Sequence, residues 1–171
     1  PWPVLDSETE YDPGWFTAGY DRVRRPDESV ADYFWVDPGH DVVTVVAETE
    51  GHLVMVEQYR PKLGERFLEC PAGGVEDGES FEAAAERELR EETGYRADAT
   101  RLVGTYHPTA LCRFERGIVV AEGLHPGEPD HDDGEFIEVR RVPVEEAFAA
   151  ARRRGATGWT LTPLLAARAD G

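Results

Sequence analysis

The sequence predicts a domain of the α/β class, or of the related α+β class, with helices packed on a mixed β-sheet. Short apolar or alternating runs recur between residues 33 and 70 and again between residues 102 and 141, separated by turns rich in Pro, Gly and Asp. One long amphipathic helical stretch lies between these two groups, and helical patterns follow Pro143. Strands and helices mixed in this order favour one domain around a single core.

The N-terminal third predicts an extended start followed by strands. Residues 1–14 resemble an extended lead-in, and Trp2 and Trp15 indicate that it packs on another surface. Asp-Pro-Gly-His and Thr-Glu-Gly sequences then mark turns between strands. The strands expected in this part are Tyr33–Val36, Val42–Ala47, His52–Tyr59 and Phe67–Cys70.

The rest of the chain predicts three helices and three strands. A helix over Ser80–Thr93 ends at Gly94, which takes the left-handed position after the last turn. Pro143 opens a second helix that ends at Gly155, and Thr162 caps a third with Pro163 in its first position. The strands expected here are Leu102–Tyr106, Glu115–Ala121 and Phe136–Arg141.

Composition excludes several classes of protein. At 171 residues and 40% hydrophobic content the chain can bury a core, so a wholly disordered chain is excluded. It has no apolar run near the ~20 residues of a membrane helix and no signal peptide, so we expect a cytoplasmic protein with no membrane partner. Two cysteines, Cys70 and Cys112, form neither a disulfide framework nor a zinc cluster, and we expect free thiols.

The charge of the chain excludes a nucleic-acid partner. The net charge is −17, which would repel a phosphate backbone. Lys62 is the only lysine, so 17 of the 18 cationic side chains are arginine. This excess of acid with almost no lysine resembles proteins of salt-loving organisms, in which salt screens the repulsion between carboxylates.

The helix over Ser80–Thr93 carries acidic residues on its apolar side. Glu88 and Glu92 lie within about 20° of Phe81 on a helical wheel, and Glu91 lies at the border of the apolar stripe. Two readings are open: the end of the helix protrudes into water, or a divalent cation offsets the repulsion. Mg²⁺ prefers oxygen ligands, and the absence of interleaved His or Cys argues against zinc.

Nine residues from Gly73 to Tyr95 resemble the Nudix box, G-x5-E-x7-R-E-U-x-E-E-x-G-U, where U is a bulky aliphatic residue. Every spacing agrees, and Tyr95 in the last aliphatic position is the one departure. The matching residues are Gly73, Glu79, Arg87, Glu88, Leu89, Glu91, Glu92, Gly94 and Tyr95. The resemblance implies an α/β/α sandwich around a mixed sheet over residues 31–171, which hydrolyses a nucleoside diphosphate linked to another group.

The resemblance also implies roles for the residues of the box. Glu88, Glu91 and Glu92 would bind Mg²⁺ or Mn²⁺, with Glu91 and Glu92 counted as catalytic. The carbonyl of Ala72 would join the metal ligands. Glu79 and Arg87 would form an ion pair that fixes the loop to the helix.

Three further segments resemble the ADP-ribose pyrophosphatase subfamily: Gln58–Pro61, Leu68–Gly73 and Asp133–Val139. By this resemblance Arg60 would contact the substrate diphosphate, and Glu69 the substrate or the metal. Glu135 would be the general base, with Asp132 and Asp133 as other candidates. In the loop Tyr106–Leu111, Ala110 stands where the subfamily commonly has proline, which bears on the choice of substrate.

An aromatic platform for the base and a second copy of the chain complete the expectations. Trp35 is the candidate platform, with Trp15 and Tyr33 as alternatives. Related enzymes often borrow such a residue from a dimer partner, so we expect a homodimer to which residues 1–30 contribute. The expected function is metal-dependent hydrolysis of ADP-ribose or a nucleotide sugar. The alternatives are a house-cleaning nucleoside triphosphate pyrophosphatase and a non-catalytic nucleotide sensor.

Overall fold

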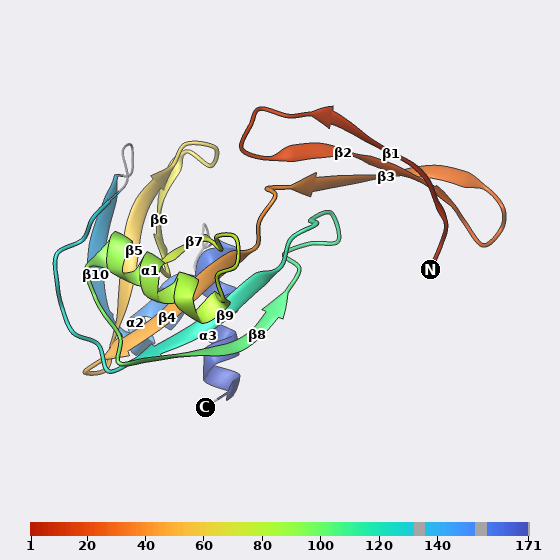
Figure 1. The fold of residues 1–171 in the computed structure, drawn as a ribbon. Coiled ribbons are helices and arrows are strands. Elements are labelled where there is room, and N and C mark those ends of the chain that lie inside the picture. Colours follow the sequence, from red (N-terminus) through yellow and green to blue (C-terminus); the bar gives the residue numbers. More distant parts are fainter. Residues whose placement is uncertain (132–135, 153–156, 171) are drawn as a thin grey trace. The chain divides into compact units, whose positions relative to one another are not determined.

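A computed structural model describes residues 1–131, 136–152 and 157–170 of the chain (Figure 1). The chain divides into two packed units. The N-terminal unit comprises Pro1–Asp41 and Tyr106–Glu115, and the larger unit comprises Val42–Thr105 and Arg116–Gly171. The sequence predicted a lead-in over residues 1–30 and a domain over residues 31–171, and this division stays a prediction. Among the described helices, none has the length and apolar character needed to cross a membrane.

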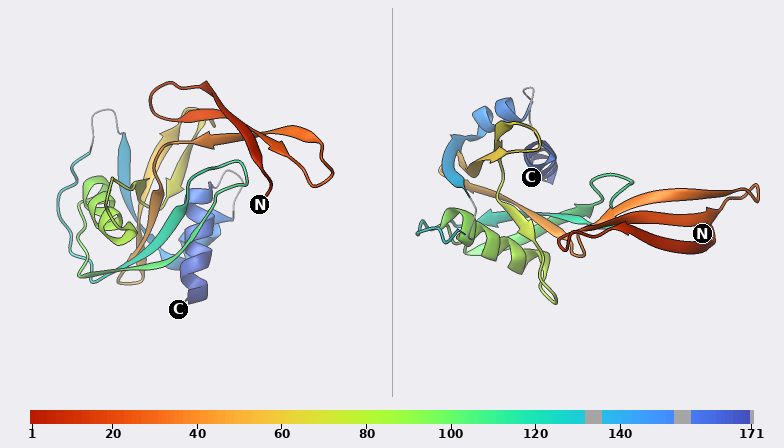
Figure 2. Two further views of the ribbon diagram at one scale, coloured as in Figure 1. Left: turned by 45° about the vertical axis from the view of Figure 1, so that its right-hand side comes forward. Right: turned by 90° about the horizontal axis from the view of Figure 1, so that it is seen from above.

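The N-terminal unit is a three-stranded antiparallel sheet in the order β1-β2-β3, and Figure 2 shows its strands side by side. These strands are β1 (Val4–Tyr11), β2 (Thr17–Arg24) and β3 (Val30–Asp37). The prediction of an extended lead-in over residues 1–14 missed β1 as a paired strand. Every side chain of β1 is exposed, so the strand has no buried face that a sequence pattern could reveal.

The larger unit contains a seven-stranded sheet, and this sheet is mixed, as predicted. Strand β4 pairs in parallel with β9 and antiparallel with β5, in a sheet ordered β10-β5-β4-β9-β8. Strand β6 adds to β5, and β7 adds to β4. The strands are β4 (Val42–Thr49), β5 (His52–Arg60), β6 (Glu65–Glu69), β7 (Ala72–Gly74), β8 (Ala99–Tyr106), β9 (Arg116–Glu122) and β10 (Ile137–Pro143).

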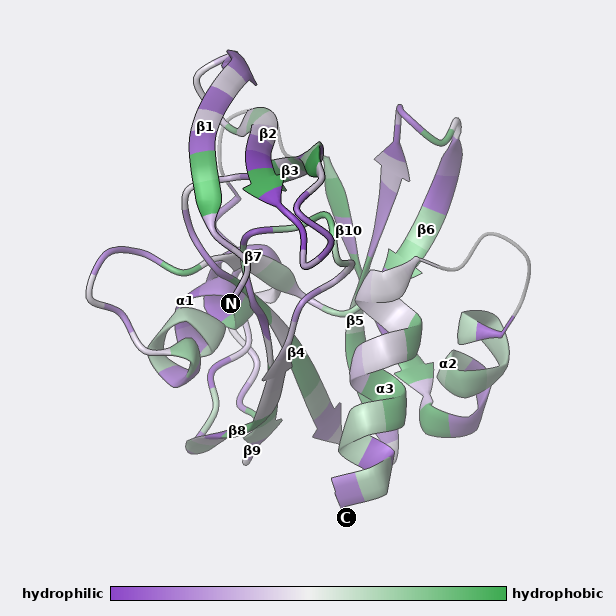
Figure 3. Ribbon diagram, turned by 90° about the vertical axis from the view of Figure 1, so that its right-hand side faces the viewer, coloured by the Kyte–Doolittle hydropathy of each residue, from purple (hydrophilic) through white to green (hydrophobic). Residues whose placement is uncertain are grey.

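Helices cover both faces of this sheet, which confirms the predicted α/β/α sandwich (Figure 1). Helix α1 (Phe81–Thr93) packs its Ala84, Ala85 and Leu89 on one face. The helices α2 (Val144–Ala151) and α3 (Gly158–Asp170) cover the other. Much of α2 and the middle turns of α3 are coloured hydrophobic in Figure 3, whereas the C-terminal end of α3 carries hydrophilic residues.

Strand β4 splits between two neighbours, and this split positions the loop before α1. Its residues Val42–Thr44 pair with β7, whereas Glu48 and Thr49 pair with β5. Between them, the Val45 amide donates to the carbonyl of Pro71 at 2.8 Å. The short strand β7 is thus fixed by its pairing with the first half of β4. It lies directly before the turn that leads into α1.

Helix α1 has the ends that the sequence predicts. The hydroxyl of Ser80 accepts the Ala83 amide at 3.2 Å, and Gly94 adopts φ 77° after the last turn. The amide of Gly94 donates to the Arg90 carbonyl at 2.8 Å. Both ends are therefore capped by residues adjacent to the helix.

Helix α3 begins at Gly158, so the predicted start at Thr162 is wrong. Pro163 lies inside the helix, where its missing N–H would leave the Trp159 carbonyl without its usual donor. The Cys70 amide donates to that carbonyl at 3.3 Å and replaces the lost bond. Pro143 precedes α2 as its N-cap, and Gly155, the predicted end of α2, lies outside the described residues.

Candidate active site

The C-terminal half of α1 faces the backbone of β7 (Ala72–Gly74), which leads into the loop before the helix. The carboxylate of Glu92, 5% exposed, accepts the Ala72 amide at 3.0 Å. The carboxylate of Glu88 lies so close to Gly73 that a Cβ there would meet its oxygens at 1.9 and 2.3 Å. Only glycine, which has no side chain, leaves this space at position 73. The carboxylate of Glu88 can therefore pack directly against the backbone there.

Burial of these carboxylates excludes one of the two readings of the helix. The side chains of Glu88 and Glu91 are 14% and 31% exposed, and Glu92 is buried. The helix end therefore does not protrude into water. The carboxylates lie against protein, where a charge requires partners.

Arg87 supplies several of those partners. Its guanidinium donates to both carboxylate oxygens of Glu79, at 3.2 and 3.0 Å, and to the Gly74 carbonyl at 2.6 Å. Its Nη1 lies 2.7 Å from Glu88 and 3.3 Å from Glu91. The predicted ion pair of Glu79 with Arg87 is therefore present, and it joins the loop to the helix.

This arrangement also affects the protonation of Glu79. The guanidinium of Arg87 holds the pKa of the Glu79 carboxyl below its ordinary value of 4.5. The Glu79 carboxylate also accepts the Glu76 amide at 3.1 Å, which closes the turn before α1. Glu79 therefore stays ionised and fixes both the turn and Arg87.

The donor set of the box suits a hard divalent cation, although Glu88 and Glu91 contact Arg87 and Glu92 accepts the Ala72 amide in this structure. Glu88, Glu91 and Glu92 offer oxygen donors, and glycine at position 73 leaves space beside Glu88. Over residues 1–131, 136–152 and 157–170, however, no three acidic, His or Cys side chains form a group that could hold a metal ion. Glu88, Glu91 and Glu92 therefore stay predicted ligands, and a metal-holding cluster is not assembled among these residues.

Arg60 and Glu69 form a second polar centre, and Glu69 lies three residues before Ala72 in the chain. The Nε and Nη2 atoms of Arg60 lie 3.0 and 2.6 Å from Oε2 of Glu69. Glu69 is 1% exposed, whereas the side chain of Arg60 is 35% exposed. The sequence selected both residues as contacts to ligands, and the structure shows that Glu69 is a buried partner of Arg60.

The predicted platform Trp35 lies in the N-terminal unit. Its side chain is 8% exposed, and the guanidinium of Arg113 lies 4.0 Å from the centre of its ring. A Cβ at Gly19 would meet the same ring at 2.8 Å. The alternatives Trp15 and Tyr33 are 62% and 42% exposed. Packing inside its own unit therefore accounts for Trp35.

The predicted general base Glu135 lies outside the described residues, as do Asp132 and Asp133. The segment just before them is fixed to the end of α1. The Asp130 amide donates to the Glu91 carbonyl at 2.9 Å, and Nε2 of His131 donates to the Glu92 carbonyl at 2.8 Å. We expected His131 to be a loop residue from the sequence, and its contact with the Glu92 carbonyl at the end of α1 was not predicted.

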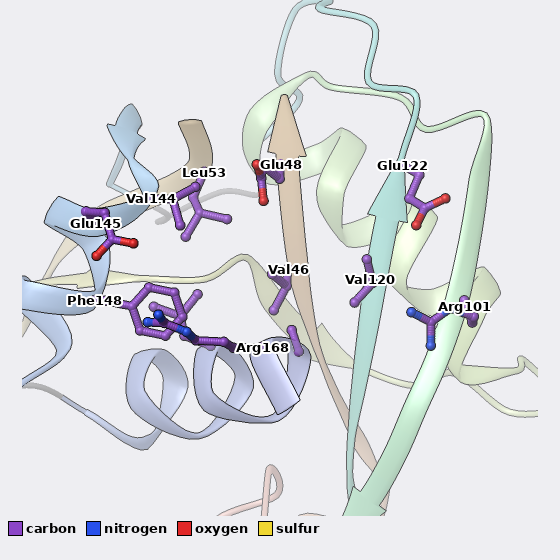
Figure 4. Close-up of a pocket in the computed structure, with 12 residues that line it drawn as sticks. Val46, Glu48, Leu53, Arg101, Val120, Glu122, Val144, Glu145, Phe148 and Arg168 are labelled. Atoms are coloured by element: carbon purple, nitrogen blue, oxygen red, sulfur yellow. The ribbon is translucent and has the colours of Figure 1, made fainter. Parts of the chain in front are cut away.

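A cavity of about 340 Å³ lies on the face of the sheet opposite α1 (Figure 4). Val46, Val120, Phe148 and Leu164 are among its apolar walls. Among the described residues, none that the sequence singled out for catalysis or binding lines it. The candidate site is therefore the loop and helix on the α1 side.

Comparison with known proteins identifies the family. A model of the NUDIX domain matches residues 37–163. The chain belongs to the Nudix family. A solved structure described as an ADP compounds hydrolase superposes on this Nudix protein with a TM-score of 0.87, 22% identity, and coverage of 98% of this chain and 92% of that one. This likeness confirms the fold.

Curated relatives are similar to this Nudix protein over much of its length. An ADP-sugar pyrophosphatase of Mus musculus is 38% identical over 67% of this chain and 57% of its own length. An ADP-ribose pyrophosphatase of Bacillus subtilis is 37% identical over 68% of this chain and 64% of its own length. One of Mycobacterium tuberculosis is 34% identical over 84% and 72%. The chain thus spans less than two thirds of the first two relatives.

Proposed function

We propose that this Nudix protein is a divalent-metal-dependent hydrolase that cleaves the pyrophosphate bond of a nucleoside diphosphate derivative, with ADP-ribose or a nucleotide sugar as its substrate. One observation carries the proposal: Glu88 and Glu92 lie against the backbone of Ala72 and Gly73. The relatives named as ADP-ribose and ADP-sugar pyrophosphatases support this choice of substrate.

The proposal assigns the metal to α1, which we call the Nudix helix. Glu88, Glu91 and Glu92, with the carbonyl of Ala72, would hold Mg²⁺ or Mn²⁺. Nudix hydrolases generally use divalent metals, and oxygen donors suit both of these ions. The metal, when bound, supplies positive charge to phosphoryl oxygens and lowers the pKa of a bound water.

The remaining roles belong to the protein itself. Arg60 would bind an oxygen of the diphosphate, because a guanidinium matches the geometry of phosphate. Arg87 would hold Glu88 and Glu91 near the loop through its bonds to both. Glu135 would accept a proton from the attacking water as the general base.

The aromatic platform for adenine needs an accessible ring face. Trp15 and Tyr33 are 62% and 42% exposed, whereas Trp35 is buried under Arg113. We therefore propose Trp15 or Tyr33, rather than Trp35, as the side chain that stacks on the base.

A second copy of the chain is the partner that we propose. The N-terminal unit exposes large apolar side chains, including Tyr11, Trp15 and Phe34, each more than half exposed. Such exposure is typical of protein interfaces. Light scattering should give twice the mass of the chain, and a single-chain mass at micromolar concentration would contradict the homodimer.

The other parts of this proposal are a small nucleotide as substrate, no nucleic-acid partner and a cytoplasmic location.

The proposed activity is tested by separating the products of hydrolysis. Purified protein with ADP-ribose and Mg²⁺ or Mn²⁺ should release AMP and ribose 5-phosphate, and a chelator should stop the reaction until the metal is returned. Cleavage of nucleoside triphosphates alone would indicate the house-cleaning activity instead. Tight nucleotide binding without turnover on any substrate would indicate a sensor.

A further inference from the structure

The buried carboxylate of Glu69 divides its two oxygens between different parts of the larger unit. Its Oε2 accepts Nε and Nη2 of Arg60, at 3.0 and 2.6 Å, and Nε2 of Gln58 at 3.2 Å. Its Oε1 accepts the hydroxyl of Thr157 at 2.5 Å. Because Glu69 is 1% exposed, these groups replace the water that would otherwise solvate its charge.

Thr157 lies at the start of α3, 88 residues after Glu69 in the chain. Its carbonyl accepts the amides of Thr160 and Leu161, at 3.2 and 3.3 Å, as the residue before a helix does. Its hydroxyl oxygen also accepts the Trp159 amide at 3.3 Å. A hydroxyl has one hydrogen, and here that hydrogen points to Glu69. The first turn of α3 and the carboxylate of Glu69 are therefore joined by a directed bond.

Arg60 is the other charged member of this network, and only one edge of its guanidinium contacts Glu69. Nε and Nη2 contact Glu69, whereas Nη1 makes no hydrogen bond within the described part of the chain. Arg60 lines a groove of about 540 Å³ together with Lys62, Thr157 and Trp159. With one edge held by a buried carboxylate, the plane of the guanidinium is fixed and its free edge is available to a ligand.

We propose that Thr157 is a positioning residue, which orients Arg60 toward the substrate diphosphate by fixing the carboxylate of Glu69. This inference rests on the proposed function of the site. The terminal torsion of a glutamate is broad, so the bonds from Arg60 and Gln58, which all reach Oε2, would leave the carboxylate free to turn about that oxygen. Thr157 holds the second oxygen, and the pair of Glu69 and Arg60 then has one orientation.

The test compares two threonines at the start of α3, Thr157 just before the helix and Thr160 in its first turn, which bond to neighbouring residues of β6. Thr157→Val removes the bond to Glu69. Thr160→Val, the matched control, removes a buried bond of 2.6 Å to the Leu68 carbonyl and leaves Glu69 unchanged. Thr157→Ser keeps the hydroxyl. Steady-state kinetics with ADP-ribose and Mg²⁺ are measured for all three variants and the wild type, each checked for folding by circular dichroism.

We expect Thr157→Val to raise KM about tenfold, as the loss of one hydrogen bond to a charged group implies, with kcat within about twofold. Thr157→Ser should restore the wild-type KM, and Thr160→Val should leave KM unchanged even though it lowers thermal stability. An unchanged KM in Thr157→Val, or an equal rise in Thr160→Val, would overturn the positioning role while the proposed function stands.

A second measurement separates this inference from the proposed function. Binding of inorganic diphosphate in the presence of Mg²⁺ is measured by calorimetry for the wild type and for Thr157→Val. Without turnover of ADP-ribose the proposed substrate fails, but binding about tenfold weaker in the variant still supports the positioning role. Equal binding by both proteins, or no binding by the wild type, overturns it.

Discussion

The carboxylate of Glu88 occupies the space in which a side chain at position 73 would begin. A Cβ on Gly73 would lie 1.9 Å from Oε1 and 2.0 Å from the carboxyl carbon of Glu88. Real Cβ atoms do not approach other atoms so closely, so any other residue at position 73 would displace the carboxylate. The observed position of the Glu88 carboxylate therefore requires glycine at position 73.

Gly73→Ala should therefore weaken metal binding without unfolding the protein. The group displaced is the end of a flexible side chain, so the fold adapts at little cost while the donor moves. We expect about 10- to 100-fold weaker activation by Mg²⁺, measured as the metal concentration for half-maximal turnover. Gly104→Ala is the control, because a Cβ there meets nothing within 4 Å. Equal metal dependence in both variants would contradict the role of Gly73.

Glu92→Gln should reduce turnover by about two to four orders of magnitude and keep the fold. The amide oxygen of glutamine can still accept the Ala72 amide, but the negative charge is lost. Turnover of ADP-ribose and the melting temperature are the measurements. Glu86→Gln, on the exposed side of the same helix, serves as the control. An unchanged rate in Glu92→Gln would remove Glu92 from the mechanism.

The ion pair of Glu79 with Arg87 should make part of the stability depend on pH. Because Arg87 lowers the pKa of Glu79 in the folded protein, the pair stabilises the native state above pH 4.5 and loses this effect as the pH falls through the lowered value. Glu79→Gln should cost about 1 kcal/mol at pH 7, and the difference from wild type should shrink at pH 3.5. Urea unfolding at both pH values measures this difference.

A comparison with Glu65→Gln isolates the contribution of that pair. Glu65 is an exposed residue of β6, far along the chain from the Nudix helix. Its substitution should change the free energy of unfolding little at either pH. A difference between wild type and Glu79→Gln that is the same at pH 7 and pH 3.5 would show that the ion pair does not titrate as described.

The acidic surface should make the protein more stable in salt. At a net charge of −17 the carboxylates repel one another, and the screening length falls from about 10 Å at 0.1 M salt to about 3 Å at 1 M. We expect the melting temperature at pH 7 to rise by about 4 °C over this range of KCl. The rise should vanish near pH 4.6, where the net charge approaches zero. The same rise at both pH values would exclude charge screening.

The Nudix helix could be predicted because its determinants are local. Ser80 and Gly94 cap the helix from adjacent positions, and the pattern of Leu89 and Glu92 showed that carboxylates fall on the buried side. The spacing from Gly73 onward also linked the loop to the helix. These features depend on residues within one continuous stretch, residues 73–95, so the sequence contains them directly.

The features that sequence reasoning missed depend on distant residues. Thr157 reaches Glu69 across 88 positions, and the tolerance of Pro163 inside α3 depends on the amide of Cys70. Strand β1 has no buried side chain, so only pairing with β2 defines it. The order Thr162-Pro163 is typical of a helix start. The observed start of α3 at Gly158 depends instead on long-range hydrogen bonds.

Cys70, which supplies the amide for the Trp159 carbonyl, is a free cysteine enclosed in the larger unit. Burial, together with the negative charge of Glu69, raises the pKa of its thiol to about 12. A thiol that stays protonated reacts slowly with alkylating agents and oxidants. Labels aimed at sulfur should therefore attach to the partly exposed Cys112, which makes site-specific fluorescent tagging feasible without replacing Cys70.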